Sequence, residues 1–147
     1  MPEALVFQPG YHLAPIPRGE LGELSKVIEE ALEALDAQNQ GARLMVLVEL
    51  SDLVGAMRAL CQRHGISLPS APLPHEDLFC VRPILDALER LSASPHPVSS
   101  QSGRQGLAQV KGLVCDYLRT NHPSLTWADM EAMAVITARA FESGRRS

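Results

Sequence analysis

The chain has 147 residues, of which 46% are hydrophobic and 20% are charged, and its formal net charge at pH 7 is −4. This length predicts a single domain over residues 1–147, and the apolar fraction is typical of a globular protein and excludes a disordered one. The acidic balance excludes attraction of a nucleic acid polymer or an anionic membrane by bulk charge.

The first twenty residues form a proline-punctuated arm. They contain four prolines and lack the basic stretch, followed by an apolar stretch, that marks a secretory signal. The three cysteines, at positions 61, 80 and 115, are widely separated and show no CxxC spacing, which favours reduced thiols. Both features predict a cytoplasmic protein that crosses no membrane.

Two long helices follow the arm. Apolar residues recur at helical spacing over residues 20–37, with charged residues on the opposite arc. The sequence "QNQG" at 38–41 reads as a short turn, and a second helix, apolar on almost all sides, should cover 42–64. A connection of a few residues predicts that these two helices lie antiparallel.

The character of the chain changes over residues 65–106, which hold six of the eleven prolines. Within this stretch the sequence predicts a short helix over 83–91, with proline in its first turn, flanked by loops. Two further helices are expected over 106–122 and 127–144, the second with Thr126 as N-cap, Asp129 at the capping-box position and a stop near Gly144.

No segment alternates at period two for long enough to predict a strand. The predicted fold is therefore all-α, an antiparallel helical bundle of about four to five helices. Helices this apolar leave faces that one chain with a proline-rich middle does not cover, so we expect oligomerisation to complete the bundle.

Five carboxylates stand out against this framework. Glu49 and Asp52 lie three residues apart in the otherwise almost wholly apolar run "LMVLVELSDLVGAM", so they share a helix face in a poorly solvated place. Glu29, Glu30 and Glu33 lie on the first helix and, taken alone, read as a solvated face. If the two helices are antiparallel, however, the two acidic groups lie at similar distances from the turn and converge.

The residue types favour a hard cation at this point. No histidine follows any of these acids by three, as a di-iron bundle would require, and the histidines at 12, 64, 75, 96 and 122 show no paired spacing for zinc. An all-oxygen, anionic ligand set suits Mg²⁺ or Mn²⁺, and Mg²⁺ completes its shell with waters and substrate phosphates. The sequence therefore predicts phosphate chemistry.

The sequences "EEALE" (29–33) and "ELSD" (49–52) resemble the EExxE…ExxD signature of the MazG-like all-α nucleoside triphosphate pyrophosphohydrolases. The resemblance is strong over residues 18–58 and weaker over 107–146. Residues 65–106 depart from it and look like an insertion. The resemblance implies a MazG-like helical domain that forms dimers or tetramers.

By this resemblance, Glu30, Glu33, Glu49 and Asp52 would hold Mg²⁺, and Glu29 would be an additional acid that binds the metal or orients its water. The implied reaction is hydrolysis of a nucleoside triphosphate between the α and β phosphates, which gives a nucleoside monophosphate and pyrophosphate in control of the nucleotide pool. One of these five carboxylates could serve as the general base.

Two basic positions are candidate phosphate contacts. Lys26 lies one turn before the first acids and could either touch a phosphate or pair with Glu30. Arg139, with Arg145 and Arg146, could reach phosphates across a subunit interface or could simply be solvated.

Two alternatives stay open. The first is a non-catalytic helical protein-interaction module, in which the acids only form salt bridges with Lys26, Arg43 or Arg58. The second is a carboxylate metalloprotein with redox chemistry, which the missing histidine ligands disfavour. The sequence leaves the base and sugar preference, the number of metal ions, the identity of the general base and the role of residues 65–106 undecided.

Overall fold

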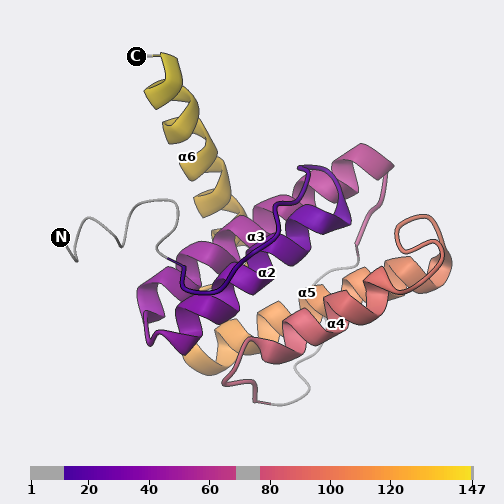
Figure 1. Ribbon diagram of the computed structural model, residues 1–147, viewed down its shortest axis with the longest axis horizontal. Helices are drawn as coiled ribbons and strands as arrows, with labels where there is room; N and C mark the ends of the chain where they lie inside the picture. The colour runs from indigo at the N-terminus through magenta and orange to yellow at the C-terminus, as the bar shows by residue number, and fades with distance from the viewer. Residues whose placement is uncertain (1–11, 69–76, 147) are drawn as a thin grey trace.

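Figure 1 shows a computed structural model of the chain, which describes residues 12–68 and 77–146, with the backbone alone for 140–146. These residues contain five helices, α2 (Leu24–Asn39), α3 (Arg43–His64), α4 (Arg82–Ser92), α5 (Gln101–Asn121) and α6 (Trp127–Arg146), and no strand. The prediction of an all-α fold is confirmed. None of the helices in these ranges has the length and apolarity needed to cross a membrane.

The helix boundaries differ from the predicted ones for local reasons. α2 begins at Leu24 instead of residue 20, because Gly22 has a φ of 90° and residues 20–23 form a turn. α5 begins five residues early, because the Ser100 hydroxyl accepts a hydrogen bond from Gly103 N and caps the helix there. α6 continues past Gly144, which keeps helical geometry, whereas glycine ends a helix when it adopts a left-handed φ.

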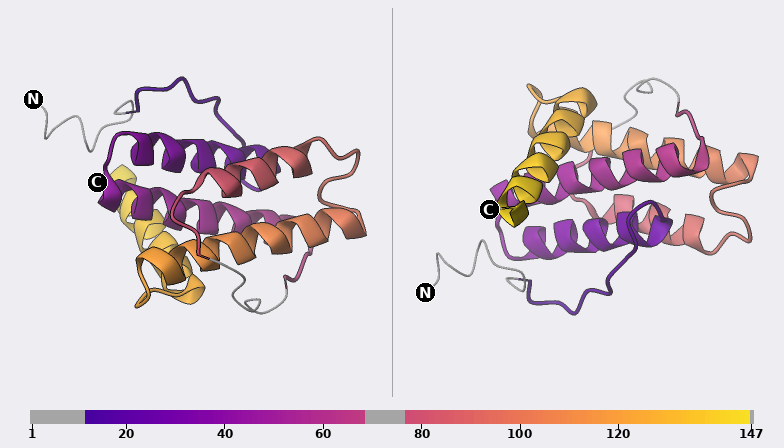
Figure 2. Two further views of the ribbon diagram at one scale, coloured as in Figure 1. Left: turned by 90° about the horizontal axis from the view of Figure 1, so that it is seen from below. Right: turned by 90° about the horizontal axis from the view of Figure 1, so that it is seen from above.

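α2 and α3 form an antiparallel hairpin and lie side by side in both views of Figure 2. The turn between them contains Gly41, whose φ of 73° suits glycine. The arm over residues 12–22 runs back along α2 in the opposite direction (Figures 1 and 2). This places residues that precede α2 next to its C-terminal half.

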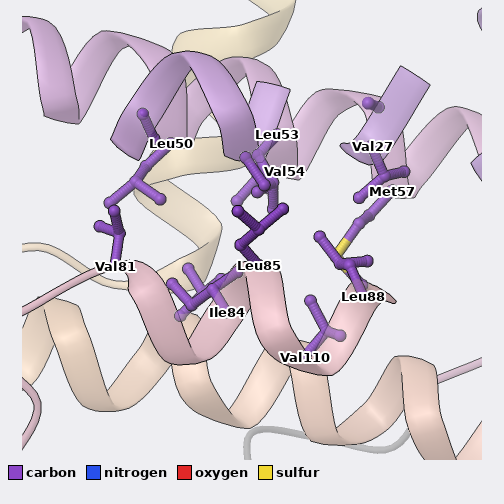
Figure 3. Packing of buried hydrophobic residues seen from close by; sticks show 14 of the residues in the cluster. Val27, Leu50, Leu53, Val54, Met57, Val81, Ile84, Leu85, Leu88 and Val110 are labelled. Atoms are coloured by element: carbon purple, nitrogen blue, oxygen red, sulfur yellow. The ribbon is translucent and has the colours of Figure 1, made fainter. Parts of the chain in front are cut away.

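The core lies between α3 and the α4–α5 pair (Figure 3). Leu50 and Met57 of α3 are fully buried and lie toward α4, which contributes Ile84 and Leu88. Val110 of α5 completes this layer (Figure 3). The apolar character of α3 on almost all sides therefore reflects a central position in the fold.

The short helix of the proline-rich middle is an integral part of this core. α4 packs against both α5 and α2. The segment before it is also tied down, because Val81 N donates to Gln38 Oε1 at 2.8 Å and Leu78 N donates to Thr120 Oγ1 at 3.0 Å. The part of 65–106 that forms α4 is thus packed into the core of the fold.

α6 packs on α3 and projects beyond the other four helices in Figure 1. Its predicted capping box is confirmed, since Thr126 N donates to Asp129 Oδ2 at 2.9 Å and Asp129 N donates to Thr126 Oγ1 at 3.2 Å. The two helices approach closely where Gly55 faces Ala134, because a Cβ atom at Gly55 would lie 2.9 Å from the Ala134 Cβ.

Candidate metal centre

The α2–α3 hairpin brings five carboxylates together. Glu29, Glu30 and Glu33 from α2 have oxygen atoms within 4.8 Å of one another, and Glu30 lies equally close to Glu49 and Asp52 from α3. The two acidic groups converge because the short turn places them at similar heights in an antiparallel pair. This is the arrangement that the spacing in the sequence predicts.

Burial distinguishes these acids from an ordinary solvated surface. Glu30 and Glu49 are 5% and 4% exposed, and Glu29 is also buried. The reading of the α2 acids as a solvated face is therefore wrong for Glu29 and Glu30, because α3 and the arm cover that side of α2. The Oε2 atom of Glu30 is buried and has no hydrogen-bond partner among the residues that the structure describes.

Three of the clustered acids, Glu30, Glu49 and Asp52, have raised pKa values in the metal-free protein. Burial, together with repulsion from Glu33 and Asp52, raises the pKa of Glu30 from 4.5 to about 7. Burial and the same kind of repulsion raise the pKa of Asp52 to about 6. Burial, a hydrogen bond with Glu33 and the neighbouring charges raise the pKa of Glu49 to about 10. A divalent cation would replace these protons and relieve the repulsion.

Lys26 is the basic residue of α2 that contacts this cluster. Its Nζ atom lies 3.1 Å from Glu29 Oε2 and 3.2 Å from Glu30 Oε1. Although burial alone would raise the pKa of Glu29, Lys26 and the Gly19 N–H, which donates to Glu29 Oε1 at 2.7 Å, hold it below its ordinary value. Glu29 is thus ionised at neutral pH. Of the two roles left open for Lys26, the structure shows the ion pair with Glu30.

Two residues that the sequence did not point to also lie at this cluster, His12 from the arm and Asp36 from α2. His12 Nδ1 lies 2.8 Å from Asp36 Oδ2, and His12 Nε2 lies 3.5 Å from Glu33 Oε2 and 3.8 Å from Glu49 Oε1. Asp36 follows Glu33 by three residues and therefore shares its helix face, and this spacing is the sequence signal that could have placed Asp36 near the cluster. For His12 the sequence offered no spacing signal, since the contact joins residues 24 apart through an irregular arm.

A cavity of about 540 Å³ opens beside the carboxylates, between α2, α3 and α6. Lys26, Glu30 and Asp52 lie in its wall, and much of the remaining lining is small or apolar. That remaining lining comprises Leu21, Gly55, Ala56, Arg58, Ala59, Ala134, Val135, Thr137 and Ala138. Arg139 is exposed on α6 and is not among the lining residues, so within one chain the structure does not bring this predicted phosphate contact to the cavity.

No protein-family model, curated protein or solved structure matches this chain. The cluster places oxygen atoms that could bind a divalent cation next to a cavity of ligand size.

We expect the metal-free protein to lose stability as the pH rises from about 4 to about 7. Asp52 and Glu30 bind protons more tightly in the folded chain than at their ordinary pKa values of 3.8 and 4.5, so the unfolded chain releases these protons first. Stability is then greatest below the unfolded pKa values and falls by about 1.4 kcal/mol per pH unit for each group within its window. Urea unfolding in a chelator at pH 5 and pH 7 measures this slope.

The pKa values of Glu29 and Asp36 are lowered in the folded chain, so these two groups make the stability increase with pH. They do so only below their ordinary pKa values of 4.5 and 3.8. Glu30→Gln is the control, because the amide does not titrate and should reduce the slope by the share of Glu30, while Asp52 and Glu49 still contribute theirs. A metal-free stability that instead increases between pH 5 and pH 7 would contradict the raised pKa values.

Proposed function

We propose that this protein is a Mg²⁺-dependent nucleotide pyrophosphohydrolase of MazG-like type, which cleaves a nucleoside or deoxynucleoside triphosphate to the monophosphate and pyrophosphate. The observation that carries the proposal is the convergence of five carboxylates from α2 and α3, two of which are almost completely buried. Buried like charges at this distance are costly unless they are protonated or bind a cation.

Mg²⁺ fits the residues present. Glu30, Glu33, Glu49 and Asp52 offer hard oxygen donors, and the buried Oε2 atom of Glu30 awaits a partner that a cation would supply. Mn²⁺, which accepts the same donors, would also fit. The EExxE…ExxD spacing of the same residues supports the assignment of the reaction to nucleoside triphosphates.

Bound Mg²⁺ supplies charge neutralisation at the phosphate oxygens and a lowered pKa for its water. Residues of the chain would orient the attacking water and bind the phosphates. Glu29, ionised and fixed by the Gly19 N–H, would orient the attacking water. Lys26, which shares the cavity wall with Glu30 and Asp52, would move from its ion pairs to a phosphate oxygen as substrate binds.

The cavity supports a nucleotide as the ligand. Its volume of about 540 Å³ lies within the range of small-molecule sites. The carboxylates and Lys26 in its wall suit a metal-bound triphosphate, whereas the small side chains of α3 and α6 leave room for the nucleoside. The proposal therefore places the phosphates at Lys26 and the nucleoside against α6.

Filling the cavity should weaken substrate binding without affecting the metal. We expect Ala138→Trp to raise KM for the preferred triphosphate by about tenfold or more, because the indole would occupy space assigned to the nucleoside. Mg²⁺-dependent stabilisation should stay at the wild-type level. Steady-state pyrophosphate release and thermal unfolding measure the two effects.

The matched control is Ala132→Trp, which places the same side chain at an exposed position of α6 that does not line the cavity. Equal KM values for Ala138→Trp and wild type would show that the substrate binds elsewhere.

One observation favours the alternative of a non-catalytic interaction module, namely that Lys26 already pairs with Glu29 and Glu30. That module would show no response to Mg²⁺. Lys26 contacts only one end of the cluster, however, and Glu33, Glu49 and Asp52 repel one another behind it. A bound cation would neutralise these three acids, which the ion pairs of Lys26 do not reach.

Self-association and a cytoplasmic location belong to the same proposal. Leu44 and Val48 lie one turn apart on α3 and are exposed, and Ile136 of α6 is 67% exposed, which supports a partner on these faces. Arg139 would reach phosphates only across such an interface.

A further inference from the structure

We propose that His12, together with Glu33 and Glu49, forms a second cation site that prefers a transition metal ion such as Mn²⁺, Co²⁺ or Zn²⁺ over Mg²⁺. This inference deepens the proposed function and rests on it, because Glu33 and Glu49 also serve the Mg²⁺ centre. The residues concerned lie outside the set that lines the cavity. The new site would thus be a neighbour of the first.

The distances suit a shared ion. Metal bonds to imidazole nitrogen and carboxylate oxygen are about 2.0–2.2 Å long, so two ligands of one ion lie roughly 3–4 Å apart. His12 Nε2 lies 3.5 Å from Glu33 Oε2 and 3.8 Å from Glu49 Oε1. An ion could therefore bind between these three atoms with little movement of the side chains.

The orientation of the imidazole is typical of a metal ligand. Histidine ligands usually donate their second ring N–H to a carboxylate or carbonyl, which fixes the tautomer and the direction of the ring. Asp36 occupies that position, since its Oδ2 atom lies 2.8 Å from His12 Nδ1. Asp36 is itself held by the N–H groups of Leu13 and Ala14 and by the Gln40 amide. The arm is thereby fixed so that Nε2 points at Glu33 and Glu49.

Burial and charge favour a cation here. The side chains of His12 and Glu49 are 12% and 6% exposed. Glu49 also belongs to the Glu30–Glu49–Asp52 group, so it adjoins the buried Glu30, whose Oε2 atom has no hydrogen-bond partner in the described ranges. Because one carboxylate can bridge two ions through its two oxygens, Glu49 would join the second site to the first.

The donor set determines the preference. Mg²⁺ prefers oxygen ligands. Imidazole is a better ligand for Co²⁺ and Zn²⁺ than for Mn²⁺, and a much better ligand for Mn²⁺ than for Mg²⁺. Replacing one carboxylate by a histidine therefore shifts selectivity toward the transition metals. The Mg²⁺ centre formed by oxygen donors alone would be unaffected by the loss of His12.

Pulsed electron paramagnetic resonance of Mn²⁺ bound to the full chain tests this site. We expect the wild-type spectrum to show coupling to a directly bound imidazole nitrogen. His12→Gln should lose that coupling and should bind the transition metal ion of the second site about 10–100-fold more weakly. The matched control His96→Gln, at an exposed position, should retain both properties. Stabilisation by Mg²⁺ should be the same in all three proteins.

Absence of nitrogen coupling in the wild type when enough Mn²⁺ is bound to fill both sites, or coupling that persists in His12→Gln, would overturn the second site while leaving the Mg²⁺ proposal intact. Absence of any response to Mg²⁺ in the wild type would overturn the proposed function instead. If His12→Gln does not fold, the variant that keeps His12 and replaces the other four histidines by glutamine decides the question, because it must retain the coupling.

Discussion

Glu49→Gln should abolish both the stabilisation by Mg²⁺ and the release of pyrophosphate. The amide keeps the size of the side chain but removes the charge and one donor shared by the ligand groups around Glu30 and Glu33. We expect kcat/KM to fall by about 10³-fold, which corresponds to about 4 kcal/mol of lost transition-state stabilisation. Pyrophosphate assays and thermal unfolding with and without Mg²⁺ measure the two losses.

In a chelator the same variant should be as stable as wild type or more stable, because burial and like charges raise the pKa of Glu49 and make its ionised form costly at neutral pH. Glu89→Gln, an exposed acid on α4, is the matched control and should change neither property. A Glu49→Gln protein that still gains stability from Mg²⁺ would show that Glu49 is not a ligand.

The second large effect concerns stability. Leu88→Ala should destabilise the protein by about 2–5 kcal/mol, because Leu88 is fully buried and its removal leaves a cavity in the layer between α4 and α3 (Figure 3). Urea unfolding measured by circular dichroism gives the difference. The matched control is Arg90→Ala, an exposed position on the same helix, which should stay within about 0.5 kcal/mol of wild type.

This comparison shows whether the proline-rich middle of the chain contributes to the stability of the fold. If Leu88→Ala behaves like Arg90→Ala, residues 65–106 are an excursion that the rest of the fold does not need. A loss in the expected range would establish α4 as part of the cooperative unit that holds the α2–α3 hairpin in place.

The helices and their order could be predicted because the signals are local. Apolar spacing, the Thr126 cap and the short turn at Gly41 each act within a few residues, and the structure has all three. The convergence of Glu30 with Asp52 followed from the same local signals, since an antiparallel hairpin with a short turn fixes which residues face each other.

The contacts that could not be predicted are those between distant segments. His12 reaches Asp36 and Glu49 through an arm without helical periodicity, so neither its path nor its neighbours are encoded by spacing. The burial of Glu29 was missed for the same reason, because periodicity within α2 cannot show that the Gly19 N–H bonds to its carboxylate. The role of α4 could not be predicted because the prolines on both sides of it resemble those of a linker.

The most direct test of the central claim is phosphorus magnetic resonance of the products formed from a panel of ribonucleoside and deoxyribonucleoside triphosphates with Mg²⁺ and the wild-type protein. We expect at least one triphosphate to be converted to its monophosphate and pyrophosphate, and Glu49→Gln to leave it intact. Formation of the diphosphate and orthophosphate, or no conversion of any nucleotide by a protein that Mg²⁺ does not stabilise, would contradict it.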